Sequence, residues 1–453
     1  MFVLIVMARV EDSATSDALL GQSLLTQDLE QLGQACADMG VDRSRALGLA
    51  VWGDGVPFNF DRSESLDVFS ISIPGLQGKV RNMRIPLFAV PHRNVIRFDT
   101  LDDLMDVLRW SFVHLALGRW PMVRHDNSEF HPKEDRLRMG KAGSSAHLHG
   151  FLVECRGDWK QLKDCFRFPQ HNELAGICWR CTANPQTWRV TGLDAPWREH
   201  RLSHWEFIGR LASRGLEASP LFGCPGLRTS CFKPDWLHVC DLGIAADFLG
   251  NFLLLVSAKF EGAGLKSRVD AMWLHIRAWY VEHQVENRLD NLYPTMIQSG
   301  PRKPPKLRAK AAQARGLVPY APFAAAELLG DSDVEITAKA MAVELAACYS
   351  LLSPENFEHS KLAEHCRRYC ALAVAMEGAH NGILWRCKPK LHLFQELCEY
   401  HVDCPSLFWT YRDEDYGGSV AQLARRRGGP NKPSIFSKVI LERHCARHAL
   451  PQL

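Results

Sequence analysis

Apolar and polar positions in the first quarter of the chain follow two different periods. Over residues 14–38 the leucines recur every three to five positions, which predicts an amphipathic helix. From residue 46 the apolar residues alternate with smaller ones and the run ends at Asp54 and a glycine, so a strand is predicted there. Two further β-rich runs, 65–73 and 84–92, are bounded by Pro and Gly. Helical spacing returns at 99–118, where early acidic residues favour a helix start.

The rest of the chain adds one strand and then long helical stretches. The apolar run HLHGFLVECRGD predicts a strand ending at Asp158, so the order is three strands, a helix and a fourth strand. Helical spacing follows at 241–260, 267–286, 334–352 and 359–376. A basic, Pro-containing segment, 301–315, interrupts these helices and is expected to be an exposed loop or linker.

Composition narrows the class of protein. With 453 residues, 46% of them hydrophobic and 23% charged, the chain is expected to fold as a soluble globular protein. No uninterrupted apolar run reaches about 18 residues, so no membrane span is predicted. The apolar opening segment lacks the flanks of a secretory signal and is interpreted as a buried strand or the ragged start of a truncated gene. Fifteen scattered cysteines, an odd number, favour reduced thiols in an intracellular protein.

Two aspartates stand where predicted strands end. Asp54 closes the first strand and Asp158 follows the fourth, and this order of elements places them on adjacent central strands of a ribonuclease-H-like sheet. Two such carboxylates can hold two Mg²⁺ ions about 3.5–4 Å apart for phosphodiester chemistry. The alternative for each aspartate is a purely structural role. Asp-Gly is a common hairpin turn, and Gly-Asp-Trp is a common sequence at the start of a loop.

Six short sequence motifs occur in a recognisable order along the chain: VWGDGVPF, ECRGDWK, ICWRC, PDWLH, KPKLH and FWTYRDE. Over roughly residues 45–430 this order resembles eukaryotic DDE cut-and-paste transposases of the Plavaka and Kyakuja-Dileera-Zisupton group. The resemblance implies an α/β fold, a ribonuclease-H-like mixed sheet with a large helical insertion. It implies Asp54, Asp158 and Glu414 as the catalytic, metal-binding acids, and three other glutamates compete with the last: Glu377, Glu396 and Glu399.

The same resemblance implies Mg²⁺ or Mn²⁺ as cofactor, transposon ends and target DNA as partners, a homodimer and a nuclear location. No DNA-binding finger or helix-turn-helix word precedes Asp54. Two other classes therefore stay open, namely a non-catalytic descendant that binds DNA or protein, and another ribonuclease-H-like nuclease. The expected division is an N-terminal helical segment (1–44), the first part of the core (45–165), a zinc-knuckle-like segment with the helical insertion (166–380) and a C-terminal part with a basic tail (381–453).

Cysteine and histidine spacing predicts a second metal. Cys178 and Cys181 have the two-residue spacing of a pair of zinc ligands. The resemblance points to His238, in the Asp-x-x-His word, as third ligand, and the candidates for the fourth are Asp235, Cys224, Cys231 and Cys240. The alternative is a set of buried thiols without metal.

Basic residues mark the expected contacts with DNA. Lys388 and Lys390 of the KPKLH word precede the proposed glutamate, and three arginines follow it, Arg425, Arg426 and Arg427. Together with the segment 301–315 these cations are suited to binding phosphates. The alternative is an ordinary solvated face, because the net charge of the whole chain is only +3.

Overall fold

The chain forms two compact units in a computed structural model that describes residues 24–75, 84–96, 98–171, 173–174, 176–300, 302–380, 382–425 and 433–447. The sheet unit comprises Met1–Gln170, Leu202–Lys233 and Thr410–Leu453, and the helical unit comprises His171–Arg201 and Pro234–Trp409. The chain therefore leaves the sheet unit twice and returns to it twice. The four-part division expected from the sequence follows other boundaries and stays a prediction.

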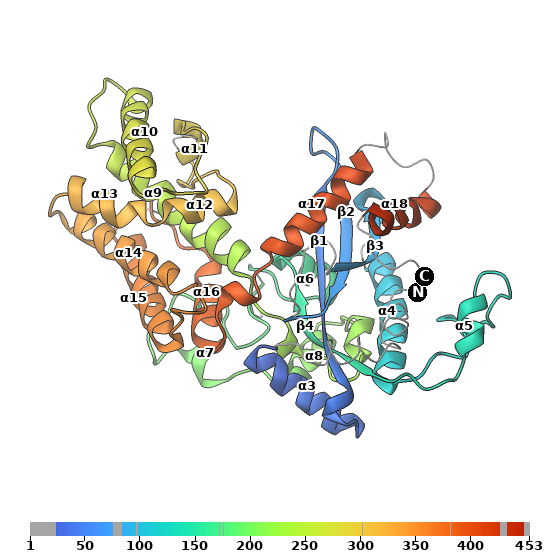
Figure 1. The fold of residues 1–453 in the computed structure, drawn as a ribbon. Helices are drawn as coiled ribbons and strands as arrows, with labels where there is room; N and C mark the ends of the chain where they lie inside the picture. Colours follow the sequence, from blue (N-terminus) through green and yellow to red (C-terminus); the bar gives the residue numbers. More distant parts are fainter. Residues whose placement is uncertain are drawn as a thin grey trace. The chain divides into compact units, whose positions relative to one another are not determined.

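A four-stranded mixed sheet organises the sheet unit (Figure 1). Its strands are β1 (Ala46–Pro57), β2 (Ser65–Ser72), β3 (Arg84–Pro91) and β4 (His149–Arg156), in the order β3-β2-β1-β4. The first three are antiparallel neighbours, whereas β4 runs parallel to β1. A parallel neighbour requires a crossover, which contains α4 (Asp99–Leu117). The predicted order of three strands, a helix and a fourth strand is confirmed.

Helix α4 has clear sequence signals at both ends. Asp99 and Asp102 lie in its first turn, where they favour the positive end of the helix dipole. Gly118 ends it with φ +61°, the left-handed conformation that glycine adopts without strain. The helix packs on β4, where Gly150 leaves room for the side chain of Leu115.

Helices from the two ends of the chain complete this unit. From the C-terminal end, α17 (Tyr411–Arg425) and α18 (Pro433–Arg447) share a core cluster with Trp52 of β1. From the N-terminal side, α3 (Thr26–Met39) packs on β1 and β4. The shorter helices of the unit are α5 (Arg136–Lys141), α6 (Trp159–Phe166) and α8 (His204–Ser213).

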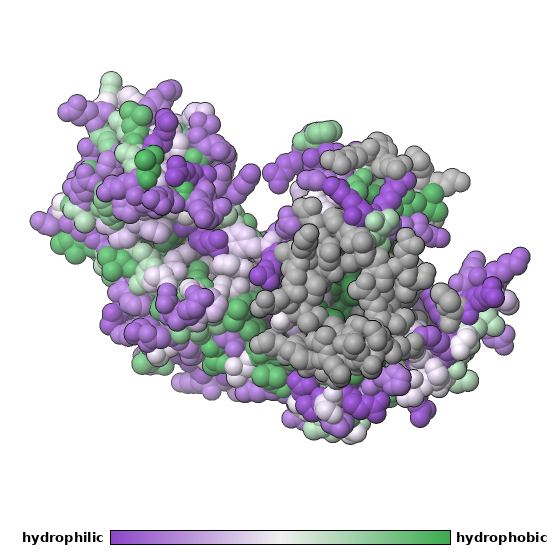
Figure 2. All heavy atoms as spheres, viewed as in Figure 1, coloured by the Kyte–Doolittle hydropathy of each residue, from purple (hydrophilic) through white to green (hydrophobic). Residues whose placement is uncertain are grey.

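The helical unit consists of a π-helix and a series of α-helices. They are η6 (Leu237–Ala245), α7 (Pro196–Glu199), α9 (Ala246–Ser257), α10 (Leu265–Glu282), α11 (Pro294–Ile297), α12 (Ala311–Leu317), α13 (Tyr320–Leu328), α14 (Asp333–Ser350), α15 (His359–Gly378) and α16 (Lys390–Tyr400). The stretch Leu237–Ser257 is long and apolar enough to cross a membrane, but 78% of its apolar window is buried inside the protein, as in a core helix. Hydrophilic residues predominate on the face of the unit seen in Figure 2.

The basic segment before α12 is anchored rather than loose. The amide of Leu307 donates to the carbonyl of Ala246 (2.7 Å), and the Lys306 ammonium donates to the carbonyl of Leu242 (2.8 Å). Gly250 permits this close approach, because a Cβ there would lie 2.4 Å from the backbone of Lys306. The expectation of an exposed loop holds for residues 302–310, of which Arg302, Lys303, Arg308 and Lys310 are exposed, but this loop is attached to neighbouring elements and is not a free linker. The segment lies against α9, and its second half is helical.

Candidate functional site

Two acids that are far apart in the sequence meet in the sheet unit. Asp54 lies on β1 opposite Val68, and one of its oxygens accepts a hydrogen bond from the amide of Gly55 (2.7 Å). Glu414 lies in the first turn of α17. A carboxylate oxygen of Asp54 and one of Glu414 lie within 4.8 Å of each other, and both residues are partly buried. Side chains at this separation can share a metal ion.

Close packing of α17 on β1 brings Glu414 to this position. A Cβ at Gly417 would lie 2.9 Å from both the Trp52 ring and a methyl group of Val56, so only glycine fits at this contact. Residues three apart share one face of a helix, and Glu414 therefore faces the strand together with Gly417. The ring of Tyr416 also meets the Trp52 ring edge-on, with 6.1 Å between centroids.

Asp158 follows β4, as the sequence predicted. The parallel register pairs Trp52 with Arg156, and a Cβ at Gly157 would lie 3.0 Å from the carbonyl oxygen of Gly53. The backbones of β1 and β4 thus run side by side, about 5 Å apart, up to the residue before each aspartate. Asp158 caps α6, accepting from the amide of Gln161 (2.6 Å). In the described part of the chain it is not among the acids that group with Asp54, so its role as a metal ligand stays a prediction.

The acid beside Glu414 has a different role. Asp413 is fully buried and pairs with Arg84 (2.7 Å) and Arg156 (3.1 Å). Arg156 also pairs with buried Glu154 (2.5 Å). Burial opposes the charge of Arg156, but Glu154 and Asp413 raise the pKa of its guanidinium. This network joins β3, β4 and α17, and it fixes α17 beside β4, the strand that leads into Asp158.

The three competing glutamates lie in the helical unit and are engaged there. Glu377 pairs with Arg189 (2.9 Å) and Glu399 with Arg198 (2.8 Å). Glu396 belongs to a second group of potential metal ligands described next. Among the four glutamates considered, Glu414 is therefore the one that the structure brings to Asp54 within the sheet unit.

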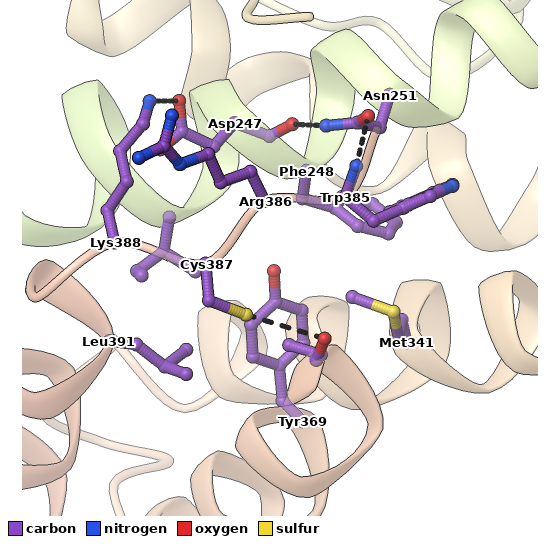
Figure 3. Close-up of a pocket in the computed structure, with 12 residues that line it drawn as sticks. Asp247, Phe248, Asn251, Met341, Tyr369, Trp385, Arg386, Cys387, Lys388 and Leu391 are labelled. Atoms are coloured by element: carbon purple, nitrogen blue, oxygen red, sulfur yellow. Dashed lines mark hydrogen bonds and ion pairs between the residues drawn. The ribbon is translucent and has the colours of Figure 1, made fainter. Parts of the chain in front are cut away.

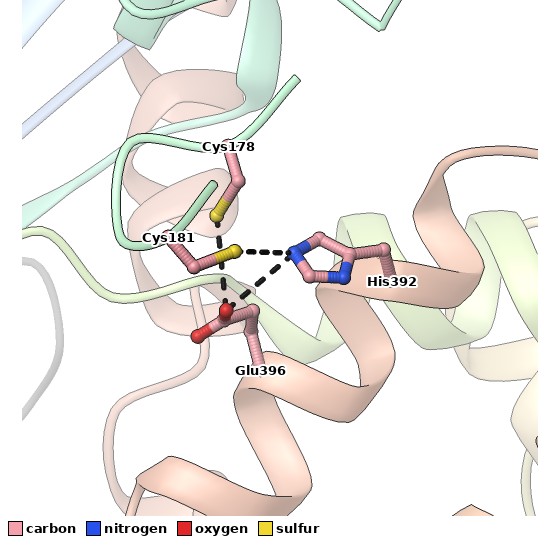
Figure 4. A group of neighbouring side chains, drawn as sticks. All are labelled: Cys178, Cys181, His392 and Glu396. Atoms are coloured by element: carbon pink, nitrogen blue, oxygen red, sulfur yellow. Dashed lines mark hydrogen bonds and ion pairs between the residues drawn. The ribbon is translucent and has the colours of Figure 1, made fainter. Parts of the chain in front are cut away.

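A buried group in the helical unit contains Cys178, Cys181, His392 and Glu396, whose ligand atoms all lie within 4.8 Å of one another (Figure 4). Cys181 Sγ is 3.3 Å from His392 Nε2, and Cys178 Sγ is 3.8 Å from Glu396 Oε1. His392 Nε2 and Glu396 Oε1 are 3.5 Å apart. The two cysteines come from a loop and the other two side chains from one face of α16, four residues apart.

The electrostatics of this group follow from burial and close contact. Burial favours the neutral imidazole, but Cys178 and Glu396 raise the pKa of His392 to about 9. Burial also opposes the Cys178 thiolate, yet contacts with Cys181 and His392 lower its pKa to about 6. Burial and the neighbouring Cys178 raise the pKa of Cys181. Cys178 is the thiol of the pair that ionises first, beside a cationic histidine.

The structure groups the cysteine pair with other residues than those expected from the sequence, and zinc binding stays a prediction. Cys178 and Cys181 do come together, but the group of described residues around them contains neither His238 nor Asp235, and none of the three other cysteines considered. Asp235 and His238 instead bond to each other, with Nδ1 2.7 Å from Oδ2 at the start of η6.

The basic residues expected to touch DNA have internal contacts. Lys388 pairs with Asp247 (2.6 Å) at the wall of a small pocket that is also lined by Tyr369 (Figure 3). The Lys390 ammonium donates to the carbonyl of His238 (2.5 Å). Arg425 donates to the carbonyl of Phe58. Arg426 and Arg427 lie outside the described residues. Contact of any of these residues with DNA remains a prediction.

Comparison with known proteins does not identify a function, so the function must be argued from the geometry of these two groups of side chains. No protein family matches the chain, and a search of curated proteins found no match either. What the arrangement can do must therefore be argued from the acids of the sheet unit and from the Cys/His/Glu group of the helical unit.

Proposed function

We propose that the sheet unit is the catalytic core of a DNA transposase of the ribonuclease-H-like DDE type, which cuts and joins phosphodiester bonds with Asp54, Asp158 and Glu414. One observation carries the proposal. The carboxylates of Asp54 and Glu414, at positions 54 and 414 of the chain, lie within 4.8 Å of each other. They do so at the end of β1, beside the strand that leads directly into Asp158.

The topology supports this reading. The sheet has three antiparallel strands and, after a helix, a fourth strand parallel to the first, and this order is compatible with a ribonuclease-H-like fold. The helical unit is inserted between β4 and α17, where a helical insertion was expected. The strands fix the two aspartates and α17 supplies the glutamate.

The donors suit a hard divalent cation. Mg²⁺ takes oxygen ligands at about 2.0–2.1 Å in octahedral geometry, so ligand oxygens lie about 3–4 Å apart, and Asp54 and Glu414 need little movement to match this spacing. When bound, two such ions would activate an attacking water or 3′-hydroxyl and stabilise the leaving oxygen. Asp413 takes no part, because its charge is already used by two arginines.

DNA is the proposed partner and the nucleus the proposed location, with a homodimer as the proposed assembly. Between residues 302 and 310 the helical unit exposes Arg302, Lys303, Arg308 and Lys310, and the whole segment 301–315 contains no acidic residue. Because the segment is anchored on α9, these cations form a fixed basic surface that is suited to phosphate contacts.

A second candidate is a non-catalytic DNA-binding descendant. The observation that favours it is the use of one Asp158 oxygen as the cap of α6, which leaves that acid outside the close Asp54–Glu414 pair. Both candidate proteins would bind DNA, but only the active transposase would cleave it.

A paired cleavage and binding assay separates them. Full-length wild type is expected to nick supercoiled plasmid in Mg²⁺ or Mn²⁺, and Glu414→Gln and Asp158→Asn should each lower the rate by about 100-fold or more. Binding to a labelled duplex should persist in both, and the matched control Glu377→Gln should cleave like wild type. Wild type that binds but never cleaves would support the descendant. Cleavage that survives Glu414→Gln and is lost in Glu377→Gln would overturn the choice of acid.

A further inference from the structure

We infer that Cys178, Cys181, His392 and Glu396 form a structural zinc site in the helical unit. The site is separate from the acids of the sheet unit, so it stands or falls independently of the proposed catalysis. The four side chains are between 0% and 2% exposed, which leaves no room for substrate. Four protein ligands with no open position are typical of structural rather than catalytic zinc.

The distances match the edges of a coordination tetrahedron. Ligands about 2.0–2.3 Å from a tetrahedral zinc lie about 3.3–3.8 Å from one another. The observed separations are 3.3 Å for Cys181 Sγ to His392 Nε2, 3.5 Å for His392 Nε2 to Glu396 Oε1 and 3.8 Å for Cys178 Sγ to Glu396 Oε1. The three edges span this range, and in Figure 4 the four side chains converge on one point.

The loop that carries the cysteines is built to hold thiolates. The amide of Arg180 points at Cys178 Sγ (3.3 Å) and the amide of Ala183 at Cys181 Sγ (3.4 Å). Two backbone donors directed at sulfur stabilise the negative form that binds metal. The loop is closed by the hydrogen bond from the amide of Ile177 to the carbonyl of Ala183 (2.9 Å), so both sulfurs are held on the same side.

Charge balance also favours a dication. Arg201 forms two 2.6 Å hydrogen bonds with the carboxylate of Glu396, and it is held beside the loop by a backbone bridge with Cys181. Two thiolates and the Glu396 carboxylate would carry three negative charges against two arginines, because Arg180 also lies 3.7 Å from Glu396 Oε2. A bound dication would offset the negative charge that the two arginines leave uncompensated. Arg201 therefore acts as the outer residue that orients the fourth ligand.

The site would join segments from the two ends of the helical unit. Cys181 and His392 are 211 positions apart, the first in His171–Arg201 and the second on α16 near the exit from the unit. The imidazole is held by the ring of Trp197, 4.6 Å away and perpendicular, from the same entering segment. A metal here would link the first and last segments of the helical unit, much as a disulfide closes a long loop.

Metal content and spectroscopy of the full chain test the inference. After dialysis against a weak chelator, wild type should retain about one equivalent of zinc more than Cys178→Ser. Co²⁺ exchanged into wild type should show the ligand-field bands of a tetrahedral site with thiolate charge-transfer absorption. Glu396→Gln should bind Co²⁺ at least tenfold more weakly. Its matched control is Glu399→Gln, on the same helix and in a comparable arginine pair, which should bind like wild type.

Cys404→Ser controls for loss of a buried thiol in the same unit. If Cys178→Ser does not fold, the Co²⁺ spectrum of the wild type is sufficient to show whether a tetrahedral metal site is present. Wild type without zinc and without tetrahedral Co²⁺ bands would show that the four groups are only a hydrogen-bonded cluster. A Glu396→Gln variant that binds Co²⁺ as tightly as Glu399→Gln would remove the carboxylate from the ligand set. Neither result bears on plasmid nicking, so this inference and the proposed function fail separately.

Discussion

The two adjacent glycines of α17 offer a direct test of how the acids are brought together. A Cβ at Gly417 would lie 2.9 Å from Trp52 and Val56, whereas a Cβ at Gly418 meets nothing within 4 Å. Because carbon atoms pack at about 3.5–4.0 Å, Gly417→Ala must move α17 away from β1 by about 0.6–1.1 Å. Glu414, one turn earlier on the helix, moves with it. No acid is changed by this substitution.

The expected magnitudes separate the two variants. Gly418→Ala should stabilise the protein by about 0.5–1 kcal/mol, because alanine favours the helix. Gly417→Ala makes the same gain but adds an overpacking cost of about 1–3 kcal/mol. A displacement near 1 Å of a reacting group can cost about 100-fold in rate. Nicking by Gly417→Ala should therefore fall by up to about 100-fold, whereas Gly418→Ala should match wild type.

Plasmid nicking and calorimetric titration with Mn²⁺ measure the effect, and the titration does not depend on turnover. Gly417→Ala should bind Mn²⁺ more weakly than Gly418→Ala. The reasoning is refuted if both variants bind and cleave alike, because the fit of α17 on β1 would then not set the position of Glu414.

Three further changes test other features. Asp413→Asn removes a carboxylate shared by two buried arginines. Hydrogen exchange of the sheet amides should show that the free energy of unfolding falls by about 3–5 kcal/mol. An equal fall in the control Asp415→Asn, at the exposed neighbour, would contradict this. Burial and Glu154 raise the pKa of Asp28 to about 7, so the folded chain keeps a proton that the unfolded chain releases near pH 4. Thermal stability should then fall as pH rises from about 4 to 7, and Asp28→Asn should lose that dependence; an unchanged pH profile would argue against it. Gly250→Ala should lower the melting temperature of the helical unit because its Cβ would meet the backbone at 2.4 Å, and unaltered protection of the α9 amides would speak against this packing.

The sheet could be predicted because its signals are local. Alternating apolar residues define β1, and acidic residues followed by a left-handed glycine define α4. The predicted strand end at Asp54 was wrong, because β1 continues to Pro57 and Asp54 pairs with Val68 inside the sheet. Which residues would meet across 360 positions is not a local property. The resemblance to transposases, rather than any spacing, singled out Glu414, and the structure places it beside Asp54.

The residues grouped around Cys178 and Cys181 show why local chemistry was insufficient. Asp235 and His238 lie three residues apart, and His392 and Glu396 lie four apart, so both pairs have the spacing of ligands on one helical face. Only the packing of α16 against the cysteine loop distinguishes them. The role of Asp413 was equally hidden, because nothing in WTYRDE shows which acid is buried against arginines.

The interleaving of the two units also has a consequence for synthesis. At about 5–20 residues per second, about 18–72 s pass between the addition of Asp54 and that of Glu414 to the growing chain. During that time β1 lacks the helix that covers Trp52, and Arg156 lacks Asp413. On the proposed function, a nascent chain cannot assemble its metal-binding acids before Glu414 has been added. Products of synthesis that stop before residue 410 would therefore be unable to cut DNA.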